Sequence, residues 1–297
     1  MWSPAFQKAC QRVYYSFFGH PRFRAAPGLA QKGTLIMAVR VRFAPSPTGH
    51  VHIGNIRAAI FNWLFARHEG GEFLLRIEDT DRERSTSEAI DTLLDAMAWL
   101  DLNCDADPLY QTSQRPNHLA AAERLQAAGH AYRSAKGGAS EAILFRIPWD
   151  CDDIPEVRTV GSATLDIHRE TPVTVDATGV TFAQVSKKGK AMPAAACLAG
   201  FRDLQIVDEQ GNVRFALNDV IDQILAQDAS FSVDGGTTLR FTRREVVFQD
   251  LVKGELSKPL DSMKDLVIVR GDESPVFHLA NVGDDITQQI THVIRGD

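Results

Sequence analysis

Fourteen consecutive residues, 42–55, combine prolines, glycines and two histidines in a pattern suited to binding phosphate; they read RFAPSPTGHVHIGN. The prolines fix backbone angles in the loop, and His52 can donate a hydrogen bond to a phosphate oxygen and stabilise charge that develops there. Gly54 has no side chain, so a flat ring can lie against its backbone. Because a single histidine in such a loop is more often structural, the whole string carries the prediction of a phosphate site.

A second polar string, residues 76–81, reads RIEDTD and places three carboxylates within four positions. It stands at the end of an apolar run that predicts a strand. A group of this kind is compatible with a solvated turn, a magnesium site or a site for an amine. The residue types alone leave these three interpretations open.

Predicted strands and helices alternate around both strings. Residues 39–43 and 73–77 predict two buried strands, and apolar residues at helical spacing between them predict a helix that ends at the glycine pair 70–71. Ser85 and Glu88 form a capping box that predicts the start of the next helix. This order implies an α/β fold with a parallel sheet. Both strings then lie at the carboxyl ends of its strands, where such sheets bind ligands.

The pattern changes in the middle of the chain. Residues 139–245 contain short β-like runs separated by turns, with a helical pattern at 217–225, and predict an inserted α+β subdomain. The α/β pattern then returns, with a strand at 266–270, a helix at about 276–286 and a strand at 291–294. The expected division is therefore an N-terminal extension (1–37), the first half of an α/β domain (38–138), the insertion (139–245) and the incomplete start of a second half (246–297).

The composition excludes several classes of protein. The chain has 297 residues, of which 44% are hydrophobic and 24% charged, as in globular proteins that need no disulfide or metal to stabilise their core. No apolar run reaches the length of a transmembrane helix. The four cysteines are far apart and form no CxxC pair, which argues against a disulfide framework and a structural zinc site and favours a reducing compartment.

Charge is distributed unevenly along the chain. Residues 1–68 contain nine Lys or Arg and no Asp or Glu, although the net charge of the whole chain is −6. This asymmetry points to an anionic ligand near the N-terminal part. Residues 1–37 are compatible with a transit peptide or with a mis-chosen start, in which case Met37 is the true first residue. The scarcity of serine favours the second interpretation.

The string at 42–55 resembles the signature loop of the class I aminoacyl-tRNA synthetases, specifically the bacterial type of the glutamyl-tRNA synthetase family. HIGN matches the HIGH motif, with Asn55 in place of its second histidine. Two strings near the end, SPVFHLANVGDD at 274–285 and THVIRGD at 291–297, are similar to segments of the same family. Phe277 departs from the family pattern, whose tyrosine contacts the amino acid through its hydroxyl.

The resemblance implies a Rossmann-like class I synthetase nucleotide-binding fold, and it carries roles to the matching positions of this chain. His52 and Asn55 are expected to be catalytic, and Glu78 to hold the ammonium of substrate glutamate. Arg295 is expected to pair with the side-chain carboxylate of glutamate, and Arg42 to be its other basic contact. The expected ATP-binding residues are Pro45, Thr48, His52, Gly54 and Asn55, and the expected glutamate-binding residues are Arg42, Ser46, Glu78, Phe277, Asn281 and Arg295.

The reaction that the resemblance implies has two steps. The α-carboxylate of glutamate attacks the α-phosphorus of ATP to give glutamyl-adenylate and pyrophosphate, and the glutamyl group then passes to the terminal adenosine of tRNA. ATP is a substrate, Mg²⁺ assists, and no metal ligands are expected from the protein. The tRNA is expected to bind by its acceptor end, with help from the insertion. The protein is expected to be a monomer of the cytoplasm with no membrane contact, or an organellar protein if residues 1–37 are a transit peptide.

The second signature of class I synthetases, KMSKS, does not occur in the sequence. Family members continue beyond the string at 291–297. We therefore expect the N-terminal catalytic portion of a longer enzyme, truncated before KMSKS. Two alternatives stay open: the paralogue that glutamylates a tRNA anticodon base, and a non-catalytic fragment that binds glutamate or ATP.

Overall fold

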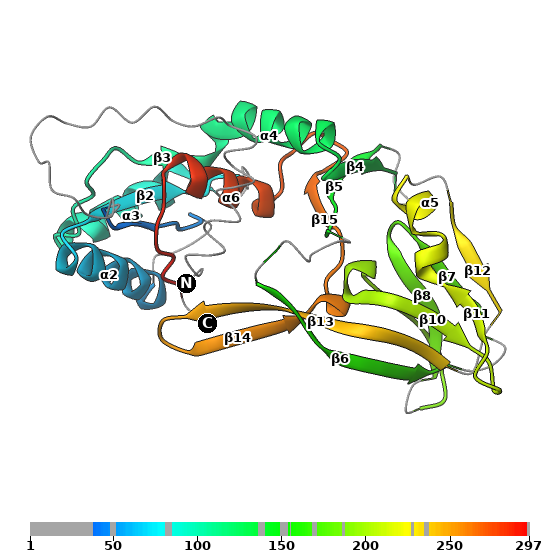
Figure 1. The fold of residues 1–297 in the computed structure, drawn as a ribbon. Helices are drawn as coiled ribbons and strands as arrows, with labels where there is room; N and C mark the ends of the chain where they lie inside the picture. The colour runs from blue at the N-terminus through cyan, green and yellow to red at the C-terminus, as the bar shows by residue number, and fades with distance from the viewer. Residues whose placement is uncertain are drawn as a thin grey trace, which may run out of the picture.

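A computed structural model describes most of the chain after the first 37 residues (Figure 1). The extension expected over 1–37 lies outside the described residues, as does Thr48. The described ranges are 38–47, 52–80, 85–135, 140–148, 154, 156–167, 171–185, 188–226, 229–234 and 238–295.

A parallel sheet holds the first part of the described chain together. Its strands β1 (Arg40–Phe43), β2 (Glu72–Ile77) and β3 (Leu109–Tyr110) lie in the order β1-β2-β3. Helices α2 (Ile53–His68) and α3 (Ser87–Trp99) make the connections between them. The predicted parallel α/β arrangement is therefore confirmed. Its core contains Val41, Phe43, Ala59, Ala66, Phe73, Leu75, Ile77, Leu93, Met97 and Leu102.

The glycine pair at 70–71 ends α2 as predicted. Gly70 has φ +61°, a left-handed conformation that glycine adopts without strain. The amide of Gly71 donates to the carbonyl of Ala66, 2.8 Å away. A Cβ on Gly71 would overlap the carbonyl oxygen of Val39, so only glycine lets the chain pass this close to the residue before β1. The pair thus sets the short turn from α2 into β2.

The capping residue of α3 differs from the prediction by one position. The N-cap is Thr86, whose Oγ1 accepts a hydrogen bond from the amide of Ala89 at 3.2 Å. Ser85, expected in that role, has a buried Oγ with no hydrogen-bond partner among the described residues. The extended backbone of Thr86 is the conformation of an N-cap residue, so the helix starts at Ser87.

Alanine substitutions at these two neighbours are expected to have different effects. Thr86→Ala removes the acceptor for the Ala89 amide and should lower the free energy of unfolding by about 0.5–2 kcal/mol. Ser85→Ala removes a hydroxyl that has no partner in the described part of the chain, and it should leave stability unchanged or slightly higher. Urea unfolding of both variants checks this. Equal losses would show that Ser85 shares the capping role.

A small antiparallel sheet and two helices follow the parallel sheet. Strands β4 (Ala131–Ser134), β5 (Ala142–Phe145) and β15 (Leu266–Val269) pair in the order β15-β5-β4. The 3-10 helix η1 (Gln111–Gln114) leads directly into helix α4 (Arg115–Ala127). Helix α4 packs against α6 (Phe277–Thr287), and Figure 1 shows α6 beside the parallel sheet. The predicted strand at 266–270 and helix at 276–286 are thus confirmed. Ala122, Ala131, Ile143, Ile268, Val269 and Leu279 form the core between them.

The strand predicted at 291–294 is wrong. The amides of Thr291 and His292 both donate to the carbonyl of Arg40, at 2.9 and 3.2 Å, and the amide of Arg40 donates to Thr291 Oγ1 at 2.8 Å. The segment therefore meets the edge of β1 at one residue. Because successive amides converge on a single carbonyl, no strand ladder forms.

The inserted region is made almost entirely of antiparallel strands. One sheet has the order β11-β10-β13-β14 with β6 paired to β13, and the other has the order β12-β7-β8-β9. The helical pattern predicted at 217–225 forms the 3-10 helix η3 (Leu217–Asp219) and the short helix α5 (Ile221–Leu225). The other elements are β6 (Val157–Asp166), β7 (Val173–Asp176), β8 (Gly179–Val185), β9 (Ala191–Ala196), η2 (Leu198–Gly200), β10 (Phe201–Val207), β11 (Val213–Ala216), β12 (Phe231–Val233), β13 (Thr238–Asp250), β14 (Gly254–Pro259) and η4 (Leu260–Ser262).

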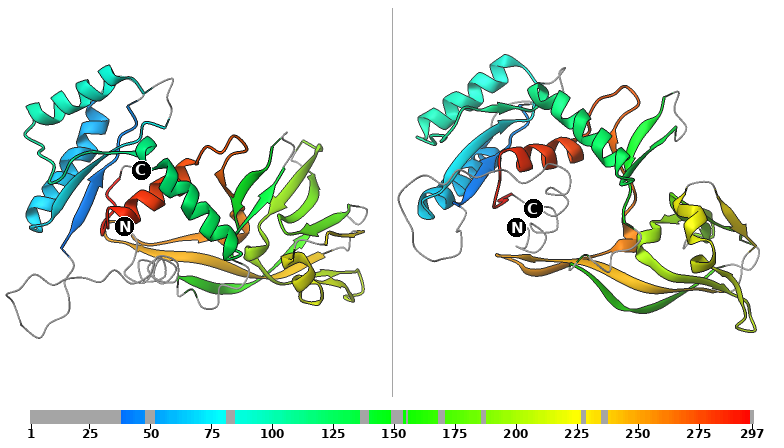
Figure 2. Two further views of the ribbon diagram at one scale, coloured as in Figure 1. Left: turned by 90° about the horizontal axis from the view of Figure 1, so that it is seen from above. Right: turned by 45° about the horizontal axis from the view of Figure 1, so that its top comes forward.

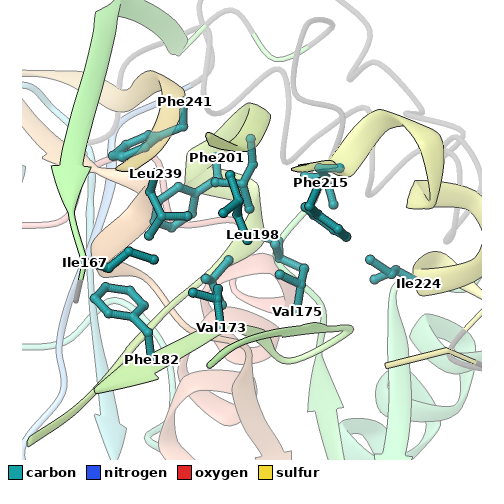
Figure 3. Close-up of a cluster of buried hydrophobic side chains, with 14 residues drawn as sticks. Ile167, Val173, Val175, Phe182, Leu198, Phe201, Phe215, Ile224, Leu239 and Phe241 are labelled. Carbon is teal, nitrogen blue, oxygen red and sulfur yellow. The ribbon is translucent and has the colours of Figure 1, made fainter. Parts of the chain in front are cut away.

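The two sheets of the insertion enclose their own hydrophobic core (Figure 3). Fourteen side chains are buried there, among them Val175, Leu204 and Leu239, and the rings of Phe201 and Phe241 lie 4.4 Å apart. Figure 2 shows this sandwich as a lobe at one side of the molecule. Strand β13 leaves the lobe and runs through residue 245, where the sequence places the end of the insertion. One strand therefore belongs to both sides of that proposed boundary.

Candidate functional site

His52 forms the N-cap of α2, directly after the proline-rich loop. Its backbone is extended, and its Nδ1 accepts a hydrogen bond from the amide of Gly54 at 3.1 Å. Because Nδ1 is the acceptor, the proton of the neutral ring lies on Nε2, which leaves an N–H for an anionic ligand. The side chain is exposed, as a ligand contact requires. The helix start also presents backbone amides and a positive dipole end.

The ring that lies against Gly54 is that of His52. A Cβ on Gly54 would come within 2.9 Å of His52 Cε1 and 3.0 Å of its Nδ1. Glycine at this position therefore makes room for the histidine to cap the helix. Asn55, half-buried, donates its amide to the carbonyl of His52 at 2.9 Å and continues the first turn.

A charged cluster is built around a guanidinium that is wholly buried, that of Arg76 on β2 (0% exposed). Its Nη1 donates to Asp285 Oδ1 at 2.5 Å, and its Nη2 donates to Glu78 Oε1 at 3.2 Å and to Asn281 Oδ1. Arg42 on β1 binds the same aspartate through two atoms, Nε to Oδ1 at 2.9 Å and Nη2 to Oδ2 at 3.3 Å. Asp285 thus joins two guanidinium groups. This bidentate geometry holds Arg42 in a fixed orientation.

Glu78 lies at the carboxyl end of β2 within this cluster. Ser46 Oγ donates to its Oε2 at 3.4 Å, and the backbone amide of Glu78 donates to the carbonyl of Pro45 at 2.9 Å. Burial raises the pKa of the Glu78 carboxyl, while the charge and hydrogen bond of Arg76 act in the opposite direction. A buried carboxylate whose charge is only partly balanced favours a cationic ligand such as an ammonium group.

The other described carboxylate of the RIEDTD string has a structural role. Asp79 accepts hydrogen bonds from the amide of Thr112 at 2.8 Å and from its Oγ1 at 2.5 Å. It therefore ties the end of β2 to η1. Asp81, the third carboxylate of the string, lies outside the described residues.

The structure brings together four of the six residues expected to bind glutamate, namely Arg42, Ser46, Glu78 and Asn281. Phe277 begins α6 and is 50% exposed, with its ring edge-on to that of His278 at 5.9 Å. Arg295 is exposed, and within the described ranges it makes no hydrogen bond to the cluster.

Two central members of the cluster had no role in the sequence prediction. Arg76 opens the RIEDTD string, yet it also belongs to the apolar strand segment EFLLRI. An arginine inside such a strand requires partners because a buried charge is costly without them, and that signal was available. Asp285 ends the string at 274–285, but nothing in its neighbourhood in sequence indicates that it faces Arg42 and Arg76.

Two further observations concern metals and membranes. Over the ranges that the structure describes, no group of three His, Cys, Asp or Glu side chains could hold a metal ion. In those same ranges, no helix is both long and apolar enough to cross a membrane.

Comparison with known proteins gives consistent matches. A family model described as "tRNA synthetases class I (E and Q), catalytic domain" matches residues 38–139 and 227–297. The chain is 36% identical over 262 residues to glutamate–tRNA ligase 1 of Gluconacetobacter diazotrophicus and 37% identical over 262 residues to that of Acidiphilium cryptum. Each alignment covers 88% of this chain and 43% of the relative, so the chain spans less than half the length of these relatives.

A solved structure gives a weaker match. It is the crystal structure of a glutamate tRNA ligase from Elizabethkingia meningosepticum in complex with its amino acid. The TM-score is 0.49 at 24% sequence identity, with 86% of this chain and 43% of that chain covered.

Proposed function

Because the chain belongs to the class I tRNA synthetases of the E and Q group, through their catalytic domain, we propose that it forms the glutamate- and ATP-binding part of a glutamate–tRNA ligase. The observation that carries this proposal is the buried cluster in which Glu78 and Asn281 bind Arg76 directly and Arg42 is joined to Arg76 through Asp285. These groups offer both signs of charge at the carboxyl ends of β1 and β2, which suits a zwitterion with an extra carboxylate.

The charges suggest how glutamate binds. Glu78 is proposed to receive the ammonium, assisted by Ser46. Arg42 commits Nε and Nη2 to Asp285, so its Nη1 is the atom proposed to contact a substrate carboxylate. Arg295 is proposed as the second guanidinium for the side-chain carboxylate.

ATP is proposed to bind at the start of α2, with its phosphates near the Nε2–H of His52 and the first amides of the helix. Pro45, Thr48, Gly54 and Asn55 are the other proposed contacts, and His52 and Asn55 are the proposed catalytic residues. Mg²⁺ is proposed to arrive on the phosphates of ATP, where it neutralises charge.

The chemistry proposed for the complete enzyme is adenylation followed by transfer. The carboxylate of glutamate attacks the α-phosphorus, pyrophosphate leaves, and His52 stabilises the charge on the phosphate oxygens. The glutamyl group then passes to the acceptor end of tRNA, which the insertion is proposed to help hold. We propose a monomeric cytoplasmic enzyme.

Calorimetric titration of the 297-residue chain with L-glutamate and with L-glutamine tests the proposal. The two ligands have nearly the same shape and differ in side-chain charge, so glutamate should bind more tightly. Arg42→Met should reduce this preference and leave the part that Arg295 is proposed to supply. Absence of glutamate binding, or equal binding of both ligands, would contradict the proposal.

Activity measurements separate the alternatives. Glutamate-dependent exchange of pyrophosphate into ATP indicates adenylation by the chain. Glutamate binding without exchange favours a binding fragment. If glutamate stays attached to the tRNA after its 3′ adenosine is removed, the result favours the paralogue that modifies an anticodon base.

Phe277→Tyr is expected to tighten glutamate binding about 2- to 10-fold, the range of one added hydrogen bond. The residue is half-exposed at the start of α6, so the change should leave the unfolding temperature unaltered. Titration of Phe277→Tyr and of Phe277→Leu, which adds no hydroxyl, checks this. No gain for tyrosine over leucine would show that a hydroxyl here does not reach the substrate.

A further inference from the structure

A buried polar network links α6 to η1 and α4, outside the charged cluster. His118 Nε2 and Asp284 Oδ1 lie 2.7 Å apart, and Gln111 Nε2 donates to Asp284 Oδ2 at 2.9 Å. The three residues are 4%, 1% and 1% exposed in the order His118, Asp284, Gln111. Both oxygens of the aspartate therefore have a partner, one from η1 and one from α4.

Asp284 and Asp285 are neighbours on α6 and face different partners. Successive residues of an α-helix point about 100° apart, so one rotation of the helix sets both directions. Asp284 engages Gln111 and His118, whereas Asp285 engages Arg42 and Arg76. Asn281, one turn before Asp285, also meets Arg76.

Apolar packing restrains the rotation of α6 only weakly. Its buried apolar residues are Leu279 and Ala280, and alanine offers little surface. Hydrophobic contacts are not directional, whereas the hydrogen bonds of Asp284 are. The polar network is therefore a directional restraint on this helix, on a different face from the bonds of Asn281 and Asp285 to the charged cluster.

The restraint forms part of a closed ring of contacts. Asp79, next to Glu78, holds Thr112, and Thr112 follows Gln111 in η1. The ring thus runs from the end of β2 through η1 to α6 and returns through Arg76 to Glu78.

We infer that His118 is a positioning residue for the glutamate pocket. Through Asp284 it fixes the rotation of α6, and with it the places of Asp285 and Asn281 against Arg42 and Arg76. The inference rests on the proposed function, because it assigns a role toward glutamate binding. Among the described residues, His118 makes no hydrogen bond or ion pair with a member of the charged cluster.

Titration of the 297-residue chain with L-glutamate tests this role in three variants. His118→Leu removes the hydrogen bond and should raise the Kd about 10-fold. His118→Gln places an amide donor at nearly the same reach and should stay within about 3-fold of the unaltered chain. Leu125→Ala shortens an apolar side chain about two turns further along α4, so it should lower the unfolding temperature while leaving the Kd unchanged.

The results distinguish a failure of the proposed function from a failure of the role inferred for His118. If the unaltered chain does not bind glutamate, the proposed function and this inference fail together. If it binds and His118→Leu binds equally well, only the inference fails. The inference also fails if Leu125→Ala weakens binding as much as His118→Leu, because His118 is then merely structural.

A second comparison applies if His118→Leu does not fold. His118→Asn and His118→Gln are both polar, and asparagine is one methylene too short to reach Asp284. Binding weakened only in His118→Asn supports the positioning role, and equal binding by these two variants overturns it.

Discussion

Replacing Arg76 by methionine should lower the free energy of unfolding by about 3–5 kcal/mol. The guanidinium is wholly buried, and its loss leaves Glu78 and Asn281 without their shared partner and Asp285 with Arg42 alone. Methionine fills much of the space but donates no hydrogen bond. The penalty is therefore that of buried, uncompensated charge, which exceeds the value of an ordinary ion pair.

Urea unfolding followed by circular dichroism measures this loss, with Arg158→Met as the matched control. Arg158 pairs with Glu255 at 2.9 Å, but both side chains are half-exposed, so the control should lose no more than about 1 kcal/mol. Similar losses in the two variants would mean that the buried cluster is no more important for stability than a surface pair.

Glu78→Gln is expected to weaken glutamate binding by about 30-fold or more, because the substrate ammonium loses its counter-charge in a buried site. The same change should raise stability at neutral pH. Burial raises the pKa of Glu78 in the folded chain, so the folded state favours the protonated form. Stability attributable to this group therefore falls as the pH rises from the unfolded pKa through the folded one, and glutamine removes that loss.

Glutamate titration and urea unfolding of this variant at acidic and mildly alkaline pH check both effects. The other groups titrate in both chains, so the difference in unfolding free energy isolates Glu78. Glu141→Gln, at an exposed position before β5, is the control and should change neither property. A Glu78→Gln variant that is less stable than the unaltered chain at neutral pH would show that the Arg76 pairing outweighs the burial of Glu78.

The sequence predicted the elements best where local signals agree. The glycine pair at 70–71 and the apolar spacing before it specify the end of α2 without reference to the rest of the chain. At Ser85 and Thr86 two adjacent hydroxyls can both cap a helix, and the choice depends on how the chain enters it. The segment 291–294 has β-branched residues suited to a strand, yet the amides of Thr291 and His292 both donate to the carbonyl of Arg40.

The motifs of the sequence predicted several residues of the candidate site but not which side chains contact one another. Arg42, Glu78 and Asn281 stand in recognisable strings, and the structure brings them together. Asp285 lies 243 positions from Arg42, and Asp284 lies 166 positions from His118. Contacts over such separations follow from the packing of α6, which the local pattern does not encode. The role of Arg295 stays a prediction.

Strand β13 has a mechanical consequence that follows from its length. Thirteen residues at about 3.4 Å each extend over roughly 40 Å, so a tilt of about 5° at one end displaces the other by about 3–4 Å. The lobe lies at one end of β13, and the exposed Leu251 and Val252 follow directly after its other end. The register of β13 against β6 shifts between Arg243 and Arg244, which is a local irregularity in the pairing. A tilt of the lobe by that amount would displace the turn between β13 and β14 by about the length of a side chain.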